Sequence, residues 1–142
     1  MYKKDNPMFH LLIGVTKAHH QQIHKLLHDL DIHRGQPPLL HLLYEEEGKN
    51  QKEISKILHL SAATVAKMVK RMERSGFITK KQDPNDHRMS RIYLTTKGKE
   101  IKKKLDKVEN EIEEKIIAGF STEEQILLKR FLIQIQDNLL DK

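Results

Sequence analysis

The chain has 142 residues, of which 37% are hydrophobic, 5% aromatic and 32% charged. This length suits one domain with a single core. No apolar run reaches the ~18 residues that cross a membrane, and no signal peptide is evident, so we expect a cytoplasmic protein without a membrane partner. The absence of cysteine excludes disulfides, thiolate zinc sites and cysteine-based redox sensing.

The net charge of +6 conceals an uneven distribution of charge along the chain. Residues 49–104 hold 16 Lys and Arg against 5 Asp and Glu, a net of +11, whereas the remainder holds 10 against 15, a net of −5. A basic block inside an acidic frame is typical of a surface that binds a polyanion. The alternative, a lysine-rich solvated surface, would scatter the basic residues along the chain.

Apolar residues at helical spacing predict a long first helix over residues 8–30. Residues 31–37 interrupt it, and the Pro37-Pro38 pair suits the first turn of a second helix that ends near residue 48. Asn50 and Glu53 form a capping-box pattern that predicts a third helix. We expect the apolar residues of this helix to face the core: Ile54, Ile57 and Leu58.

Ser61 is placed to cap a fourth helix that Gly76 ends. Two short strands, 77–82 and 91–95, are predicted on either side of the turn sequence at 83–86. A lysine-rich helix over 96–118 follows, and a capping box of Ser121 and Glu124 begins the final helix.

This order predicts a mainly α fold with a small β-hairpin, the arrangement of a winged helix. The hairpin is then the wing, and the helix pair 51–60 and 61–76 forms the helix-turn-helix. We expect a single domain over 1–142, with a head at 35–99. The first and last helices, in 1–34 and 100–142, need a further apolar surface to bury against, which is either each other or a second copy of the chain.

The helix at 61–75 has two distinct faces when residues are placed about 100° apart. An apolar stripe is formed by Val65, Met68, Val69 and Met72, and the opposite face is cationic with small residues at its tip. Such a face fits the major groove of double-stranded DNA, with Lys67 donating to guanine, Thr64 meeting a thymine methyl or a phosphate, and the later arginines meeting phosphates. The candidate DNA-binding residues of the helix are Ser61, Ala62, Ala63, Thr64, Lys67, Lys70, Arg71 and Arg74.

Arg88 lies at the tip of the predicted hairpin, where it can enter a narrow minor groove of negative potential. An acid beside such an arginine is unexpected on a surface that faces phosphates unless it orients the guanidinium. We therefore predict that Asp86 supports Arg88. The alternative is a plain polar turn.

These residues resemble the MarR family of bacterial regulators. The resemblance covers nearly the whole chain and is strongest in the helix pair, in the wing Asp83-Pro84-Asn85-Asp86-His87-Arg88, and in Tyr93-Leu94-Thr95-Thr96-Lys97-Gly98. It implies a homodimer built from the first and last helices, with two winged heads on a pseudo-palindromic operator. It further implies a sequence-specific repressor released by a small-molecule effector, with Arg88 in the minor groove.

The family's effector pocket lies between the head and the dimer helices, so we expect Gln36, His41 and Tyr44 near it. We expect no cofactor. One alternative stays open: His20, His24 and His28 share one helical face at i, i+4 and i+8, with His19 beside them, so a metal- or haem-responsive sensor is a second hypothesis. The sequence holds no glycine-rich phosphate loop and no nucleophile motif, so we predict that the chain is not an enzyme. A nonspecific chromosome-coating protein is a stronger alternative to the regulator than an enzyme is.

Overall fold

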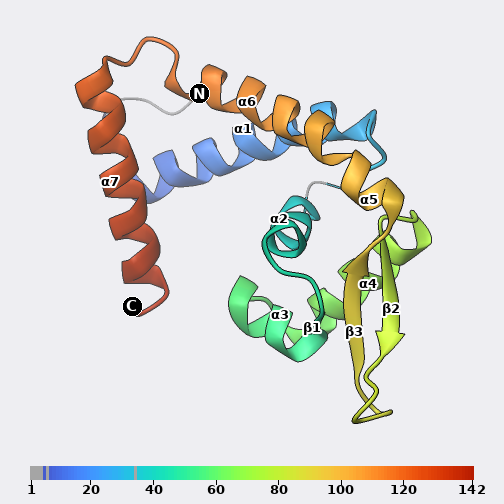
Figure 1. The fold of residues 1–142 in the computed structure, drawn as a ribbon. Coiled ribbons are helices and arrows are strands. Elements are labelled where there is room, and N and C mark those ends of the chain that lie inside the picture. Colours follow the sequence, from blue (N-terminus) through green and yellow to red (C-terminus); the bar gives the residue numbers. More distant parts are fainter. Residues whose placement is uncertain (1–4, 6, 34) are drawn as a thin grey trace. The chain divides into compact units, whose positions relative to one another are not determined.

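The structure is a computed structural model that describes residues 5, 7–33 and 35–142. The chain is mainly helical with one small antiparallel sheet, which confirms the predicted fold class (Figure 1). Residues 1–4, 6 and 34 of the predicted first dimerisation segment lie outside the described residues. The elements, in chain order, are α1 Met8–His28, α2 Pro37–Glu45, β1 Lys49–Asn50, α3 Gln51–Leu58, α4 Ala62–Arg74, β2 Ile78–Gln82, β3 Ser90–Leu94, α5 Thr96–Glu100, α6 Lys102–Ile117 and α7 Thr122–Leu139.

The backbone forms two compact units, Met1–Val108 and Glu109–Lys142. The first unit contains the helix pair and the sheet. Its core is formed by apolar side chains from α1, α2, α3, α4, both hairpin strands and the start of α6. The largest of these fully buried side chains are Phe77, Leu27, Leu39, Leu40, Leu43, Ile54, Met72, Ile78, Ile92 and Leu105.

The helix starts follow the predicted caps. The side chain of Asn50 accepts from the Glu53 N–H at 2.8 Å, and Glu53 returns a bond to the Asn50 N–H, which completes the capping box of α3. Ser61 caps α4 by accepting from the Thr64 N–H at 3.1 Å. One predicted core residue is misplaced: Ile57 is 45% exposed, because the buried face of the short helix α3 is centred on Ile54.

The sheet has a third strand that the sequence did not predict. Its order is β1-β3-β2, with Ile78 opposite Leu94 in the hairpin and Lys49 opposite Ile92 at the other edge. β1 has only two residues, too few for any alternating pattern. It forms because β3 supplies partners from a distant part of the chain, beginning with the Gly48 N–H, which donates to the Ile92 carbonyl at 2.8 Å.

The helix predicted over 96–118 is divided into α5 and α6 at Ile101. α5 is fixed against the start of β2: the Thr95 N–H donates to the Phe77 carbonyl at 3.0 Å, and Thr95 caps the helix at the Gly98 N–H at 3.1 Å. Gly98 is buried, and a Cβ added there would lie 2.1 Å from the Phe77 carbonyl oxygen. A glycine is therefore required for this close approach.

α7 belongs to the second unit, and none of its residues is buried. Seven of its large apolar side chains are exposed by 37–72%. They are Ile126, Leu127, Phe131, Leu132, Ile133, Ile135 and Leu139. Within the described part of the chain, no helix is both long and apolar enough to span a membrane.

We predict that Gly98→Ala destabilises the protein, because the new methyl group must displace the backbone of Phe77. Overpacking of this kind costs about 1–3 kcal/mol. Urea unfolding followed by circular dichroism measures the change. Gly35→Ala is the matched control, since the nearest atom to its added Cβ lies at 3.8 Å. Equal unfolding midpoints for the two variants would contradict the packing argument.

Candidate nucleic-acid interface

α4 places its two faces as the sequence predicts. Val65, Val69 and Met72 are buried and Met68 is half-buried. The candidate contact residues are exposed from one end of the helix to the other. They are Ser61, Ala62, Ala63, Thr64, Lys67, Lys70, Arg71 and Arg74.

The tip of α4 is held by local hydrogen bonds. The Ser61 hydroxyl accepts from the Thr64 N–H and donates to the Thr64 hydroxyl oxygen at 2.9 Å. His59, in the left-handed region with φ 54°, makes the turn from α3. The two small residues that follow Ser61 leave room for another molecule to approach the first turn.

The cationic face of α4 is not neutralised by the protein. Among the described residues, Lys67, Lys70 and Arg74 form no ion pair, whereas Glu73 on the flank lies 3.9 Å from Lys80. Uncompensated cations along one helix face attract a polyanion and release its counterions when it binds.

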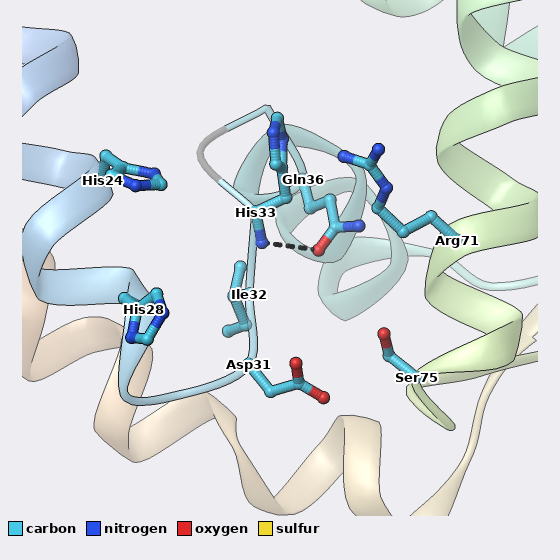
Figure 2. A pocket seen from close by; sticks show the side chains of 8 residues that line it. All are labelled: His24, His28, Asp31, Ile32, His33, Gln36, Arg71 and Ser75. Atoms are coloured by element: carbon cyan, nitrogen blue, oxygen red, sulfur yellow. Dashed lines mark hydrogen bonds between the residues drawn. The ribbon is translucent and has the colours of Figure 1, made fainter.

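Arg71 stands apart from the other cations of α4. It lies on the same side of the helix as Ser75, one turn later, and both line a cavity of about 440 Å³ in the first unit (Figure 2). The remaining walls come from α1 and from the segment that joins it to α2. These lining residues are His24, His28, Asp31, Ile32, His33 and Gln36.

The wing brings Asp86 and Arg88 together. One oxygen of Asp86 accepts from both the Arg88 N–H at 3.1 Å and its Nε–H at 3.2 Å. The Arg88 side chain is 92% exposed, so the contact orients the guanidinium without burying it.

Asp83 is a structural residue that the sequence analysis did not single out. It is only 6% exposed. One carboxylate oxygen accepts from the N–H groups of Asn85 at 2.7 Å and Asp86 at 3.2 Å, and the other accepts from Arg91 Nε at 2.6 Å. An aspartate that opens a turn and accepts the N–H two residues on is a known turn signal, and this signal was available in the sequence.

Arg91 extends this network to the far side of the sheet. Its Nη1 donates to the Gly48 carbonyl at 2.8 Å, so one side chain joins the wing to the residue before β1. The hydrogen bond from the Asn85 N–H and the Arg91 guanidinium lower the pKa of Asp83, and Asp83 in turn raises the pKa of Arg91. The wing is therefore held by an ionised pair.

The three residues expected at an effector pocket do not meet in one cavity. Gln36 is buried and lines the cavity beside Arg71. Tyr44 lines a different cavity, of about 350 Å³, and donates to the Gly98 carbonyl at 2.7 Å. The ring of His41 lies 6.2 Å from that of Tyr44. His41 and Tyr44 belong to helix α2, and neither of them lines the Gln36 cavity.

The histidine face of α1 is exposed at His19, His20, His24 and His28. The rings of His24 and His28 lie 6.3 Å apart. Over residues 5, 7–33 and 35–142, no three His, Asp or Glu side chains come together as a possible metal site. The metal-sensor hypothesis therefore gains no support from the arrangement of these residues.

Comparison with known proteins places this interface in a family. The family model described as MarR family matches residues 32–90, which include α2, the helix pair and the wing. An organic hydroperoxide resistance transcriptional regulator of Bacillus subtilis is 35% identical over 102 residues, covering 72% of this chain and 69% of the relative. The chain belongs to the MarR family.

Other MarR-type proteins agree with this assignment. YybA, an HTH-type transcriptional regulator of B. subtilis, is 29% identical over 111 residues, which cover 78% of this chain and 74% of YybA. A crystal structure of MarR matches 99% of this chain and 96% of its own, with 27% identity and a TM-score of 0.84. The S. aureus MepR–DNA complex matches 94% of this chain and 99% of its own, with 25% identity and a TM-score of 0.87.

This MarR-family chain is a DNA-binding transcriptional regulator with a winged-helix fold. Family membership also confirms the prediction that it is not an enzyme, because the family consists of transcriptional regulators.

We predict that Asp83→Asn lowers the urea midpoint at neutral pH, because the amide loses the ion pair with Arg91. The folded pKa of Asp83 lies below its ordinary value of 3.8. The stabilisation from ionised Asp83 is therefore present above that value and is lost as the pH falls through the folded pKa. Unfolding measured from pH 7 downwards should show the midpoints of wild type and variant converging in acid. A midpoint difference that does not change with pH would contradict the ion-pair role.

Proposed function

We propose that the protein is a ligand-responsive repressor that binds a pseudo-palindromic operator as a homodimer. α4 enters the major groove and Arg88 enters the flanking minor groove. The main support for this proposal is the exposed cationic face of α4, together with the wing arginine, Arg88, whose Nε lies 3.2 Å from a carboxylate oxygen of Asp86. Two such heads address half-sites about one helical turn, roughly 10 bp, apart.

The residues of α4 divide into those that read bases and those that hold the backbone. Ser61, Ala62, Ala63 and Thr64 form the tip, where small side chains and the N–H groups of the first helical turn favour close approach to base edges and to a phosphate. Lys67 donates to guanine. Lys70, Arg71 and Arg74, further along, contact phosphates, which position the helix without specifying a sequence.

We predict that Arg88→Ala weakens binding to every duplex and lowers the slope of log affinity against log salt by about 1, because it removes one cation from the DNA backbone region. Gel-shift titrations at several salt concentrations measure both quantities. Lys129→Ala, an exposed lysine of α7, is the charge-matched control. Affinity that stays at the wild-type value in Arg88→Ala would remove the wing arginine from the interface.

We predict that Lys67→Ala changes the preferred base at one position of each half-site, since a side-chain contact to guanine is worth about 1–3 kcal/mol of discrimination. Selection of bound duplexes from a random library measures the preference, with Arg74→Ala as the phosphate-contact control. The same selection separates a specific regulator from a nonspecific coating protein, which would enrich no sequence. Identical consensus sites for both variants and the wild type would contradict the assignment.

The homodimer proposal rests on the apolar surface of the outer helices. In α1, Met8 and Phe9 are 77% and 68% exposed, and α7 exposes seven large apolar side chains. Each helix thus presents large apolar side chains, which a soluble protein rarely leaves clustered in water. A second copy of the chain supplies the same surface in return, as a two-fold interface requires. We assign dimerisation to residues 1–34 and 100–142 and DNA binding to 35–99.

We predict that the double variant Leu127→Glu with Phe131→Glu is monomeric, because two carboxylates on adjacent turns cannot be buried in an apolar interface. Sedimentation equilibrium at micromolar concentration distinguishes one chain of 16.7 kDa from two. Lys129→Glu, between them on the polar side of α7, should remain dimeric. A monomeric wild-type protein at this concentration would overturn the dimer.

Ligand responsiveness is assigned to the cavity that Gln36 and Arg71 line. It lies within the DNA-binding unit and includes a residue of the recognition helix, so a molecule bound there is in direct contact with α4. Screening for compounds that release a selected duplex tests this part of the proposal, and a promoter-reporter assay tests repression.

A further inference from the structure

The sulfur of Met89 joins the wing to the first helix of the helix-turn-helix. The Asn50 Nδ2 donates to the Met89 Sδ at 3.3 Å, although the two residues lie 39 positions apart in the sequence. The Oδ1 of the same amide accepts from the Glu53 N–H at 2.8 Å and caps α3. One side chain therefore contacts α3 through its oxygen and the wing through its nitrogen.

The backbone of Met89 holds the wing turn closed. Its N–H donates to the Asp86 carbonyl at 3.0 Å, and its carbonyl accepts from the Asp83 N–H at 2.9 Å. Arg88 is the residue directly before it, and the Arg88 side chain is 92% exposed. A displacement of Met89 is therefore transmitted to the wing arginine through a single peptide bond.

The Met89 sulfur is accessible to small reagents. The residue is only half-buried, and it lines a cavity of about 560 Å³ together with Lys52 of α3 and Arg88 of the wing. Met72, in contrast, is fully buried in the core. The chain has no cysteine, so its thioethers are the sulfur groups that an oxidant can reach.

We propose that Met89 is a site of reversible oxidation by hypochlorous acid, and that the sulfoxide lowers DNA affinity by separating the wing from α3. This proposal rests on the proposed function, because it assigns a control to the wing that contacts DNA. The modification is reversible because methionine sulfoxide reductases return the sulfoxide to the thioether.

The oxidation is a two-electron step at the sulfur. A sulfur lone pair attacks the chlorine of hypochlorous acid, so that an S–Cl bond forms and hydroxide leaves. Hydroxide then adds to the sulfur, the S–Cl bond breaks, and chloride and a proton are released. The sulfur is oxidised to the sulfoxide, and the chlorine is reduced to chloride.

Both positions of the new oxygen break the contact with Asn50. A thioether sulfur has two lone pairs, and the Asn50 amide uses one of them. Oxygen on that lone pair comes between two atoms that are 3.3 Å apart and forces them to separate. Oxygen on the other lone pair withdraws electron density, which makes the sulfur a poorer acceptor. In either case Arg88 loses its fixed position relative to the helix-turn-helix.

Peptide mapping by mass spectrometry tests the site in the full chain without DNA. A stoichiometric amount of hypochlorous acid should add oxygen to Met89 and to Met8, which is 77% exposed, and should leave Met72 unmodified. The side-chain amide resonance of Asn50 should shift on oxidation in the wild type and stay unchanged in Met89→Leu. An unmodified Met89 in protein whose Met8 is fully oxidised would overturn the site.

Gel-shift titration with a duplex selected by the wild type tests the effect on DNA binding. Oxidation should weaken binding by the wild type about tenfold, comparable to the loss of one groove contact, and treatment with methionine sulfoxide reductases should restore it. Met89→Leu, which has no oxidisable sulfur at this position, should keep its own affinity after treatment. Met8→Leu is the matched control and should respond as the wild type does. An equal loss of affinity in oxidised Met89→Leu would overturn the proposal.

Asn50→Ser tests the route from the sulfur to the wing. Serine retains a capping oxygen for α3 and removes the Nδ2 donor. Met89 should still be oxidised in this variant, and its DNA affinity should be the same before and after treatment. Circular dichroism establishes that the variant is folded. A full tenfold loss on oxidation of Asn50→Ser would refute the coupling through the cap.

The outcomes separate the two proposals. A wild-type protein that enriches no duplex refutes the proposed function, while peptide mapping and the Asn50 resonance still decide whether Met89 is an oxidation site. A protein that binds its selected duplex equally well with Met89 fully oxidised refutes the control of DNA binding alone.

Discussion

The ionised contact between Asp83 and Arg91 is the constraint on which the candidate interface depends. One oxygen of the Asp83 carboxylate closes the wing turn by accepting hydrogen bonds from two backbone N–H groups. The other oxygen accepts from Arg91 Nε at 2.6 Å. Arg91 then reaches the Gly48 carbonyl and ties the hairpin to the residue before β1. β1 ends at Asn50, which caps α3. The wing and the helix-turn-helix are therefore both attached to β1. Arg88 can remain exposed because Asp83, rather than the tip itself, orders the turn.

α4 is held from its other side by packing. Val65, Val69 and Met72 bury the apolar stripe, and Phe77 continues the core into β2. The Phe77 carbonyl accepts from Thr95 and leaves no room for a side chain at Gly98. The end of α4, the start of the hairpin and the beginning of α5 therefore pack against one another. Exposed cations projecting from a helix fixed in this way are positioned before DNA arrives, which lowers the ordering cost of binding.

Much of the fold and of the candidate interface could be predicted from residues that are close together in the sequence. The caps at Asn50, Ser61 and Ser121 depend on residues three positions apart, and the two faces of α4 follow from helical periodicity. Asp86 and Arg88 are two residues apart, so their contact also lies within reach of sequence reasoning. The contacts that the sequence did not predict join segments that are distant along the chain. They are the pairing of β1 with β3, the hydrogen bond of Arg91 with Gly48 over 43 positions, and the cavity shared by Gln36 and Arg71. Ile57 was misassigned because a helix of eight residues has too few turns to define its buried side.

The sequence by itself determined the order of helices and strands, the cationic face of α4, and the wing that identifies the family. Each of these depends on residues within one or two turns of each other, where backbone geometry sets what can meet. Only the tertiary structure decided that Asp83 is a buried anchor, that Arg71 faces a cavity as well as the cationic surface, and that no described residue accepts a hydrogen bond from the Gln36 amide nitrogen. Those properties arise from burial and from the approach of α1, α2 and α4, which no local pattern encodes.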